Sequence, residues 1–352
     1  MHPEWRKFLT ARGAAFGPAE SGSHVEHFGH PAAEIAALGT RAVLCDLSQQ
    51  SLILASGDDA RAFLHGQLTN DVEKLMEDHA QWNGYCTPKG RLIASFLLWP
   101  AKQGVMLQLP REQVDATVKR LRMFVLRSKV KLDDVSDQWV SIGVAGPGAA
   151  AALAQCVERI PAGGMLSAHQ HGLRILRLES ERFVLVGAPD VVAPLWDELA
   201  APCMPCGINA WDWHAIAAGI PEVRAATRES FVPQMINFDL MGGVSFRKGC
   251  FPGQEIVART QYRGILKRRM MKAVIADALA LPTPGDAVYS PAFGDQAAGE
   301  IVLAARAPLG HHVLVVAQTE ALRQGALTLK APDGPALGIE SLPYPVTFPD
   351  AA

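Results

Sequence analysis

The sequence has few cysteines and no excess charge of either sign. Only 6 of its 352 residues are cysteine, and they show no spacing typical of a secreted disulfide framework, which favours a reducing compartment. Lys and Arg number 33 and Asp and Glu 35, so the formal net charge of −2 argues against a general binder of polyanions. We therefore expect a cytoplasmic protein that does not bind nucleic acid directly.

Long apolar runs and nucleotide-binding fingerprints are also missing. One of the longest apolar runs, residues 92–100, is interrupted by Ser95 and ends in proline, far short of the roughly 20 residues that a spanning helix needs. Arg12 interrupts the apolar run that would have to follow Arg6 and Lys7 in a signal peptide. Glycine-rich dinucleotide and P-loop motifs are absent from the sequence. We therefore expect neither membrane insertion nor nucleotide-driven chemistry.

The composition is that of a globular protein, with 49% hydrophobic and 19% charged residues, and the length suits two or three domains. Residues 1–40 are expected to be irregular, because Gly, Ala, His and Ser dominate much of this segment. We interpret its three regularly spaced histidines as part of a surface loop rather than a metal site; they are His24, His27 and His30.

From residue 41 onward, strand and helix patterns alternate. Val114, Val118, Leu121 and Val125 follow helical spacing, whereas short links between strands, as at residues 173–186, indicate hairpins. This mixture favours α+β layers over a doubly wound parallel sheet.

The pattern changes near residue 267. Short strands separated by Pro, Gly and Asp turns then predict a small β-barrel or sandwich. We place one domain over 41–266 and another over 267–352.

Cysteine motifs offer the first chemical candidates. Cys250 lies between Gly249 and Gly253, follows Lys248 by two residues, and precedes a helix predicted from Gln254. A helix N-terminus and a nearby lysine both favour the thiolate, so a reactive cysteine is predicted. The alternative is a small buried hydrophobic residue.

One pair of cysteines has C-x-x-C spacing. Cys203 and Cys206 lie in a proline-rich connector, and the sequence contains no second pair to complete a zinc site. We interpret them as surface thiols, with metal capture as the alternative.

The segment around Cys250 resembles the signature of the folate-binding YgfZ family, within the superfamily of glycine-cleavage T-proteins (GcvT, the aminomethyltransferases). The signature residues are KGCFPGQE at 248–255, followed by VAR at 257–259. Further stretches are similar to the same family, and the similarity runs from about residue 43 to the end: FLHGQLTNDV at 63–72, KGR at 89–91, GIP at 219–221, FVPQMIN at 231–237 and PYP at 343–345.

The resemblance implies a GcvT-like α+β fold with two interleaved subdomains and a C-terminal β-barrel. It implies tetrahydrofolate binding near a central channel and an accessory role in assembling or repairing iron–sulfur proteins, including enzymes that modify tRNA. Folate and iron–sulfur enzymes or assembly factors would be the partners. Cys250 and Lys248 would be the catalytic residues, and no metal site is expected.

Six residues are assigned to folate: Trp211, Gln234, Asn237, Gln254, Glu255 and Arg259. Trp211 looks like a folate-facing tryptophan of the family, although a core position is the alternative. Gln234, Asn237 and the nearby Asp239 are suited to a pterin edge or to an ordinary turn. A basic run would pair with the glutamyl tail or form a solvated face; its members are Arg259, Arg263, Lys267, Arg268 and Arg269.

One departure from the superfamily concerns catalysis. Residues 89–99, where T-proteins carry a catalytic aspartate, contain no Asp or Glu, so glycine-cleavage activity is not expected. The alternatives are a folate-dependent one-carbon (aminomethyl or methyl) transferase or demethylase, with Asp239 or Glu255 as the carboxylate, and a non-catalytic scaffold. Whether the chain is an enzyme is left open.

Overall fold

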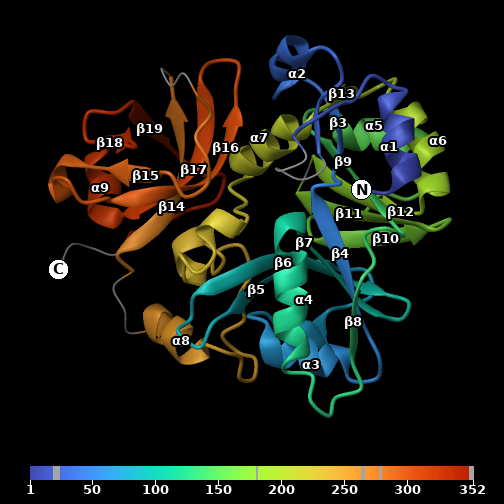
Figure 1. The fold of residues 1–352 in the computed structure, drawn as a ribbon, viewed down its shortest axis with the longest axis horizontal. Coiled ribbons are helices and arrows are strands. Elements are labelled where there is room, and N and C mark those ends of the chain that lie inside the picture. The colour runs from blue at the N-terminus through green and yellow to red at the C-terminus, as the bar shows by residue number, and fades with distance from the viewer. Residues whose placement is uncertain (19–23, 180, 263–265, 277–279, 349–352) are drawn as a thin grey trace. The chain divides into compact units, whose positions relative to one another are not determined.

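The computed structural model describes residues 1–18, 24–179, 181–262, 266–276 and 280–348 (Figure 1). The chain divides into two compact units, and neither is one continuous segment. The first unit comprises Met1–Phe63, Val72–Gln81 and Phe96–His214, and the second comprises Leu64–Asp71, Trp82–Ser95 and Ala215–Ala352.

A six-stranded sheet forms the centre of the first unit. Neighbouring strands of this sheet pair antiparallel, except that β13 (Met204–Cys206) runs parallel to β3 (Val43–Asp46). Strands β9 (Val140–Ala145) and β12 (Arg182–Gly187) are buried at every position, so their sequences lack the alternation of a half-exposed strand. In spatial order the strands are β10 (Leu166–Gln170), β11 (Leu173–Glu179), β12 (Arg182–Gly187), β9 (Val140–Ala145), β3 (Val43–Asp46) and β13 (Met204–Cys206).

Three helices contribute to the core of this sheet: α1 (Pro3–Thr10), α5 (Ala149–Cys156) and α6 (Pro189–Leu199). The Trp5 ring packs edge-on against Trp196 with centroids 5.6 Å apart. Trp5 Nε1 also donates a 2.8 Å hydrogen bond to Asp46 Oδ1 on β3. The aromatic ring is thus buried while its polar atom keeps a partner.

The prediction of an irregular segment over residues 1–40 was wrong. This segment forms α1, α2 (Pro31–Ala37) and a two-stranded ladder of β1 (Ala15–Phe16) and β2 (Val25–His27). Both helices have proline in the first turn, a start signal that the glycine-rich composition between them obscured. The side chains of Trp5 and Leu9 are buried, so distant packing partners rather than local propensity stabilise α1.

A five-stranded sheet has the spatial order β5 (Gln81–Cys86), β6 (Leu92–Ala101), β7 (Gly104–Pro110), β4 (Gln50–Ser56) and β8 (Lys131–Asp134). The division between the two units falls within β6. The helix predicted near residue 114 is α4 (Val114–Arg122), whose Val118 and Leu121 are buried as the spacing indicated. Val125 lies beyond the end of α4.

A closed β-barrel begins at Arg268 in the second unit, close to the predicted change in pattern. Its core is apolar, with the side chains of Ile275, Val313 and Val315 fully buried. Closure leaves every barrel strand with two neighbours and removes exposed edges. In spatial order the strands are β14 (Arg268–Ile275), β17 (His311–Gln318), β16 (Gly299–Arg306), β15 (Ala287–Tyr289), β18 (Leu327–Leu329) and β19 (Ala336–Glu340).

The other elements connect or cover these sheets. Among the described residues, no helix has the length and apolar character needed to cross a membrane. The remaining α-helices are α3 (Ala60–Gln67), α7 (Ile208–Ala218), α8 (Gln254–Tyr262) and α9 (Thr319–Gln324). The short 3-10 helices are η2 (Val72–Lys74), η3 (Arg111–Gln113), η4 (Ala225–Thr227), η5 (Pro233–Ile236) and η6 (Pro291–Phe293).

Candidate functional site

The Cys250 loop, residues 245–253, is fixed to the end of α3 in the second unit. Lys248 Nζ donates hydrogen bonds to the backbone carbonyls of His65 and Leu68, the second at 2.5 Å. These carbonyls belong to the last turn of α3 and the residue after it, where a cation complements the negative end of the helix. The Lys248 side chain is buried, so its charge anchors the loop.

A second set of bonds ties the start of the loop to residues just after α3. The Ser245 amide donates to the Thr69 carbonyl at 3.0 Å. Thr69 Oγ1 donates to the Gly243 carbonyl at 2.7 Å, and Asn70 Nδ2 donates to the Gly242 carbonyl at 2.6 Å. The residue types alone indicate no such role for Thr69 and Asn70, and their place in the 63–72 motif is the only signal in the sequence that points to them.

The end of the Cys250 loop packs against the KGR motif. Gly253 has φ +80°, and a Cβ there would lie 2.4 Å from the Thr87 carbonyl oxygen and 2.6 Å from the Gly90 amide nitrogen. Neither the backbone angle nor this space admits a larger residue, so glycine is required at 253. The motifs at 63–72, 89–91 and 248–255 therefore come together around one loop.

Cys250 is the exposed cysteine of the chain. Cys45, Cys86, Cys203 and Cys206 are buried, and Cys156 is partly buried. The buried-hydrophobe interpretation of Cys250 therefore does not apply. The helix predicted from Gln254 is confirmed as α8, which places Cys250 four residues before the helix begins.

The prediction of surface thiols at Cys203 and Cys206 was wrong. Both side chains are buried: Cys203 packs in the apolar core of the first unit, and Cys206 lies on the edge strand β13, where it pairs with Cys45 on β3. Burial raises the pKa of Cys203 to about 11 and that of Cys206 to about 12. Both thiols are therefore protonated near neutral pH and are poor metal ligands in this state.

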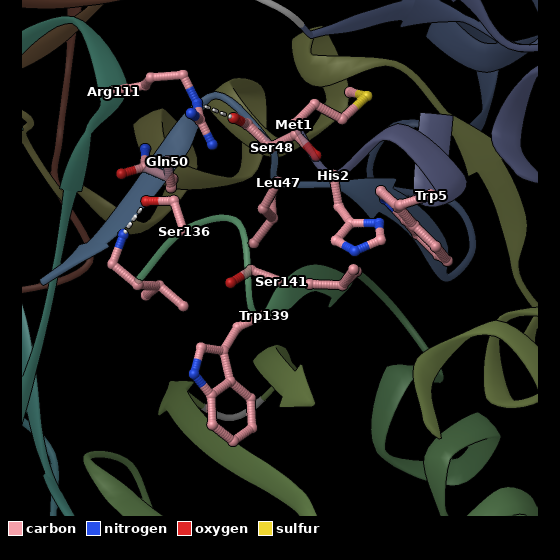
Figure 2. A pocket seen from close by; sticks show the side chains of 12 residues that line it. Met1, His2, Trp5, Leu47, Ser48, Gln50, Arg111, Ser136, Trp139 and Ser141 are labelled. Carbon is pink, nitrogen blue, oxygen red and sulfur yellow. Dashed lines mark hydrogen bonds between the residues drawn. The ribbon is translucent and has the colours of Figure 1, made fainter. Parts of the chain in front are cut away.

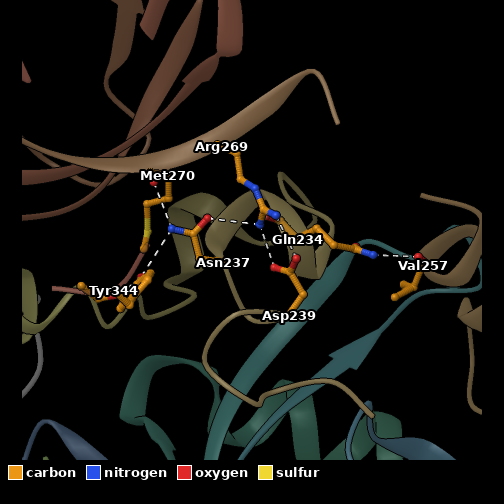
Figure 3. Close-up of polar contacts among 8 residues, drawn as sticks. Gln234, Asn237, Asp239, Val257, Arg269, Met270 and Tyr344 are labelled. Atoms are coloured by element: carbon orange, nitrogen blue, oxygen red, sulfur yellow. Dashed lines mark hydrogen bonds and ion pairs between the residues drawn. The ribbon is translucent and has the colours of Figure 1, made fainter. Parts of the chain in front are cut away.

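Gln234, Asn237 and Asp239 surround the Arg269 side chain from β14 (Figure 3). The Arg269 guanidinium makes two bonds to the Asp239 carboxylate, at 2.7 and 2.9 Å, and a third to the Gln234 carbonyl at 2.7 Å. The Arg269 and Asp239 side chains are only 8% and 4% exposed. Arg269 is thus a buried partner of Asp239, whereas Arg263 of the same basic run lies outside the described residues.

Asn237 joins three of the family motifs within the second unit. Its Nδ2 donates to the Met270 carbonyl at 3.0 Å and to Tyr344 Oη at 3.4 Å (Figure 3). Tyr344 Oη in turn donates to the Gly219 carbonyl at 2.6 Å. Burial raises the pKa of Tyr344 to about 12. The amide of Asn237 is therefore part of the bonding that holds PYP, GIP and FVPQMIN together.

Helix α8 presents the remaining predicted folate residues. Glu255 and Arg259 are exposed, and Gln254 is partly buried at the first position of the helix. Gln234 Nε2 donates to the Val257 carbonyl at 2.7 Å. Among the described residues, the buried Gln234 Oε1 has no hydrogen-bond partner, so one buried acceptor in this region is unused.

Trp211 lies on α7 in the first unit and packs against the six-stranded sheet. The Arg182 guanidinium is 4.1 Å from the ring centroid, and a Cβ on Gly143 would come within 2.5 Å of ring atom Cζ3. Only 6% of Trp211 is exposed. These contacts are those of a packed core residue, and the assignment of Trp211 to folate stays a prediction.

Figure 2 shows a small cavity in the first unit, lined among others by Gln50, Arg111 and Trp139. Its volume of about 10 Å³ is room for a single water and far too small for a pteridine. Arg111 Nε donates across this region to the Ser48 carbonyl at 2.9 Å.

A larger cleft of about 680 Å³ also lies in the first unit, lined by residues that include Arg159, His169 and Arg174. Arg174, its partly buried cation, already donates to the Glu77 and Pro100 carbonyls and to Ser167 Oγ. The volume of the cleft is in the range of ligand pockets, but the Arg174 guanidinium is already hydrogen-bonded within the protein.

Replacing Lys248 with methionine is expected to lower the free energy of unfolding by about 2 kcal/mol, since charge-assisted hydrogen bonds to two carbonyls are lost. Methionine is unbranched and of similar length, so it fills the space of the aliphatic part of Lys248. Urea denaturation followed by circular dichroism measures the effect. The exposed Lys102→Met is the matched control, with an expected change below about 0.5 kcal/mol; equal stability of the two variants would contradict the anchoring role.

The fold class of the protein is shown by its similarity to a solved structure and to a family model. The solved glycine cleavage system aminomethyltransferase T from Bartonella henselae matches with a TM-score of 0.74, covering 96% of each chain at 17% identity. The GCVT N-terminal domain model matches residues 6–170. The protein therefore has a GcvT-like α+β fold with a C-terminal β-barrel.

The particular family follows from the curated relatives. The tRNA-modifying protein YgfZ of Hamiltonella defensa is 30% identical, over 74% of this chain and 77% of that protein. The protein of the same name from Vibrio vulnificus strain YJ016 is 32% identical, over 67% of this chain and 72% of its own length. The chain belongs to the YgfZ family.

Proposed function

We propose that this chain is a tetrahydrofolate-binding accessory protein for the assembly or repair of iron–sulfur proteins, with Cys250 as its reactive thiol. Family membership and the GcvT-like fold support a folate-related role. The observation on which the proposal chiefly rests is the exposure of Cys250 in a loop that other family motifs hold in place. A thiol kept in solvent on a fixed backbone is available to a partner.

Four of the proposed folate residues carry groups suited to a reduced folate. The exposed carboxylate of Glu255 suits the amino-pyrimidinone edge of a pterin, and the exposed guanidinium of Arg259 suits the carboxylates of the glutamyl tail. Gln234 supplies a buried acceptor with no partner in the described structure, and Gln254 begins the helix that bears the other two. Bound tetrahydrofolate would supply a carrier for a one-carbon unit.

Lys248 and Asn237 are proposed to act indirectly, by holding other parts of the protein in position. Lys248 positions Cys250 by anchoring its loop to α3. Asn237 is also proposed to serve folate binding, by holding together the motifs to which it is hydrogen-bonded. The partners would be cytoplasmic iron–sulfur enzymes or assembly factors, and the relatives named as tRNA-modifying proteins suggest that such clients include enzymes of tRNA modification.

The alternative, folate-dependent one-carbon transfer, requires a carboxylate at the reacting centre. Of the two candidates, Asp239 is already bonded to Arg269 in a buried pair, which leaves Glu255. This observation favours the accessory role over the transferase or demethylase.

Tetrahydrofolate is expected to raise the melting temperature of the protein, because a ligand that binds only the native state stabilises it. At a concentration of about 100 times Kd the gain is about 2.7 kcal/mol. Differential scanning calorimetry under reducing conditions measures the shift, and Arg259→Ala should weaken it. The exposed Arg247→Ala serves as the matched control. No shift at saturating tetrahydrofolate would refute folate binding.

A further inference from the structure

The cleft of about 680 Å³ in the first unit borders one edge of the six-stranded sheet. Its lining includes residues 166–169 of the edge strand β10, and Ile160 and Pro161 add apolar surface. Pockets of this volume that hold small organic molecules combine apolar walls with a few well-placed polar groups. The charged and polar groups of this cleft therefore indicate which ligand it suits.

Arg174 is fixed in the cleft by hydrogen bonds that leave its charge in place. Nη1 donates to the Glu77 carbonyl at 3.3 Å and to Ser167 Oγ at 3.1 Å, and Nη2 donates to the Pro100 carbonyl at 3.1 Å. These acceptors are neutral, so they orient the guanidinium without cancelling its charge. Among the described residues, the Nε–H and one Nη2–H make no hydrogen bond and remain for an anionic ligand. Partial burial lowers the pKa of Arg174, so a bound anion would offset part of its desolvation cost.

The other charged groups of the lining leave an excess of positive charge. Lys102 and Arg159 are exposed and form no ion pair within the described ranges of the chain. Glu77 and Asp78, by contrast, each have a basic partner, at 3.1 and 2.7 Å. Their side chains are 82% and 70% exposed, so water and salt screen the two carboxylates. The unpaired charge of the cleft is therefore positive.

The edge of β10 adds a backbone donor. Gln170 and Leu173 pair across a two-residue turn, which makes them a hydrogen-bonded pair of the β10–β11 ladder. Because such pairs alternate along a strand, the amide of His169 points away from β11, toward the edge of the sheet. The Ser167 amide faces the same way and donates to the Asp78 carbonyl at 2.7 Å. His169 lines the cleft, so its N–H suits the oxygen of an anion there.

We propose that this cleft binds an organic anion that carries at least two carboxylate or phosphate groups. Arg174 and the His169 amide are the donors for one anionic group, and Lys102 and Arg159 are the cations for another. The apolar surface at residues 160–161 covers the carbon skeleton. The site uses none of the residues assigned to the proposed function, and so goes beyond it.

Isothermal titration calorimetry of the full chain tests this site with two probes, trimesate for carboxylates and ADP for phosphates. At least one should bind saturably with a Kd of about 1 mM or lower, and the tighter probe assigns the anionic group. Inorganic pyrophosphate, which has no carbon skeleton, should bind more weakly than that probe. Arg159→Ala and Lys102→Ala should each weaken binding about tenfold. Arg127→Ala removes an exposed cation of the first unit outside this lining and is the matched control, with unchanged binding.

The Ala162→Asp variant supplies a second measurement. Ala162 is an exposed residue of the lining, so the change adds a carboxylate to the cleft without removing a side-chain bond, and binding should be lost. Three results would each overturn the proposal: no saturable binding of either probe, pyrophosphate binding as tight as that of the better probe, or unchanged affinity in all three cleft variants. The titrations contain no folate, so each of these results would leave the proposed function standing.

Discussion

The Asp239→Asn variant is expected to lose about 3–5 kcal/mol of unfolding free energy, because it leaves the Arg269 guanidinium buried without its counter-charge. The two side chains are 8% and 4% exposed and share two hydrogen bonds, so solvent cannot replace the lost carboxylate. Denaturation in urea, with the transition followed by both fluorescence and circular dichroism, measures the loss.

Two controls separate burial from charge. Asp133 pairs with Lys131 at 2.7 Å, but those side chains are 31% and 76% exposed, so Asp133→Asn should change stability by less than about 1 kcal/mol. The double variant Asp239→Leu with Arg269→Met should be more stable than either single change, since no unpaired charge remains. A loss of under 1 kcal/mol for Asp239→Asn would show that the Arg269 charge does not need this partner.

The Cys250→Ser variant is expected to abolish rescue of iron–sulfur enzyme activity in a deletion strain while leaving the fold and tetrahydrofolate binding intact. The side chain is exposed, so exchange of sulfur for oxygen should alter stability by no more than about 0.5 kcal/mol. The hydroxyl of serine does not ionise near neutral pH, so any step that requires a thiolate is lost. Activity of a client enzyme in cell extracts measures the outcome.

The matched control is Cys156→Ser, which removes a partly buried thiol of the first unit and should rescue like wild type. The expression level and melting temperature of each variant exclude loss of protein as the cause. Full rescue by Cys250→Ser would remove the thiol from the proposed function and would favour the scaffold alternative.

Local patterns in the sequence predicted several of the helices and strands. The spacing of Val118 and Leu121 identified α4, and glycine and proline turns identified the strands of the barrel, because these signals act between near neighbours. The same reasoning missed α1, whose Trp5 packs on Trp196 from far along the chain. It also put Cys206 on the surface, because pairing of β13 with β3 is not visible in the residues around the cysteine.

The sequence by itself determined the family resemblance, the α+β character, the barrel near residue 267 and the motif that singles out Cys250 among the cysteines. Only the tertiary structure decided which side chains hold the loop of that cysteine in place and which are paired with other residues. Lys248 binds the end of α3, and Asp239 binds Arg269. Residue type and spacing specify local conformation and chemical capacity, whereas the partner of a buried charge depends on which distant segments pack together.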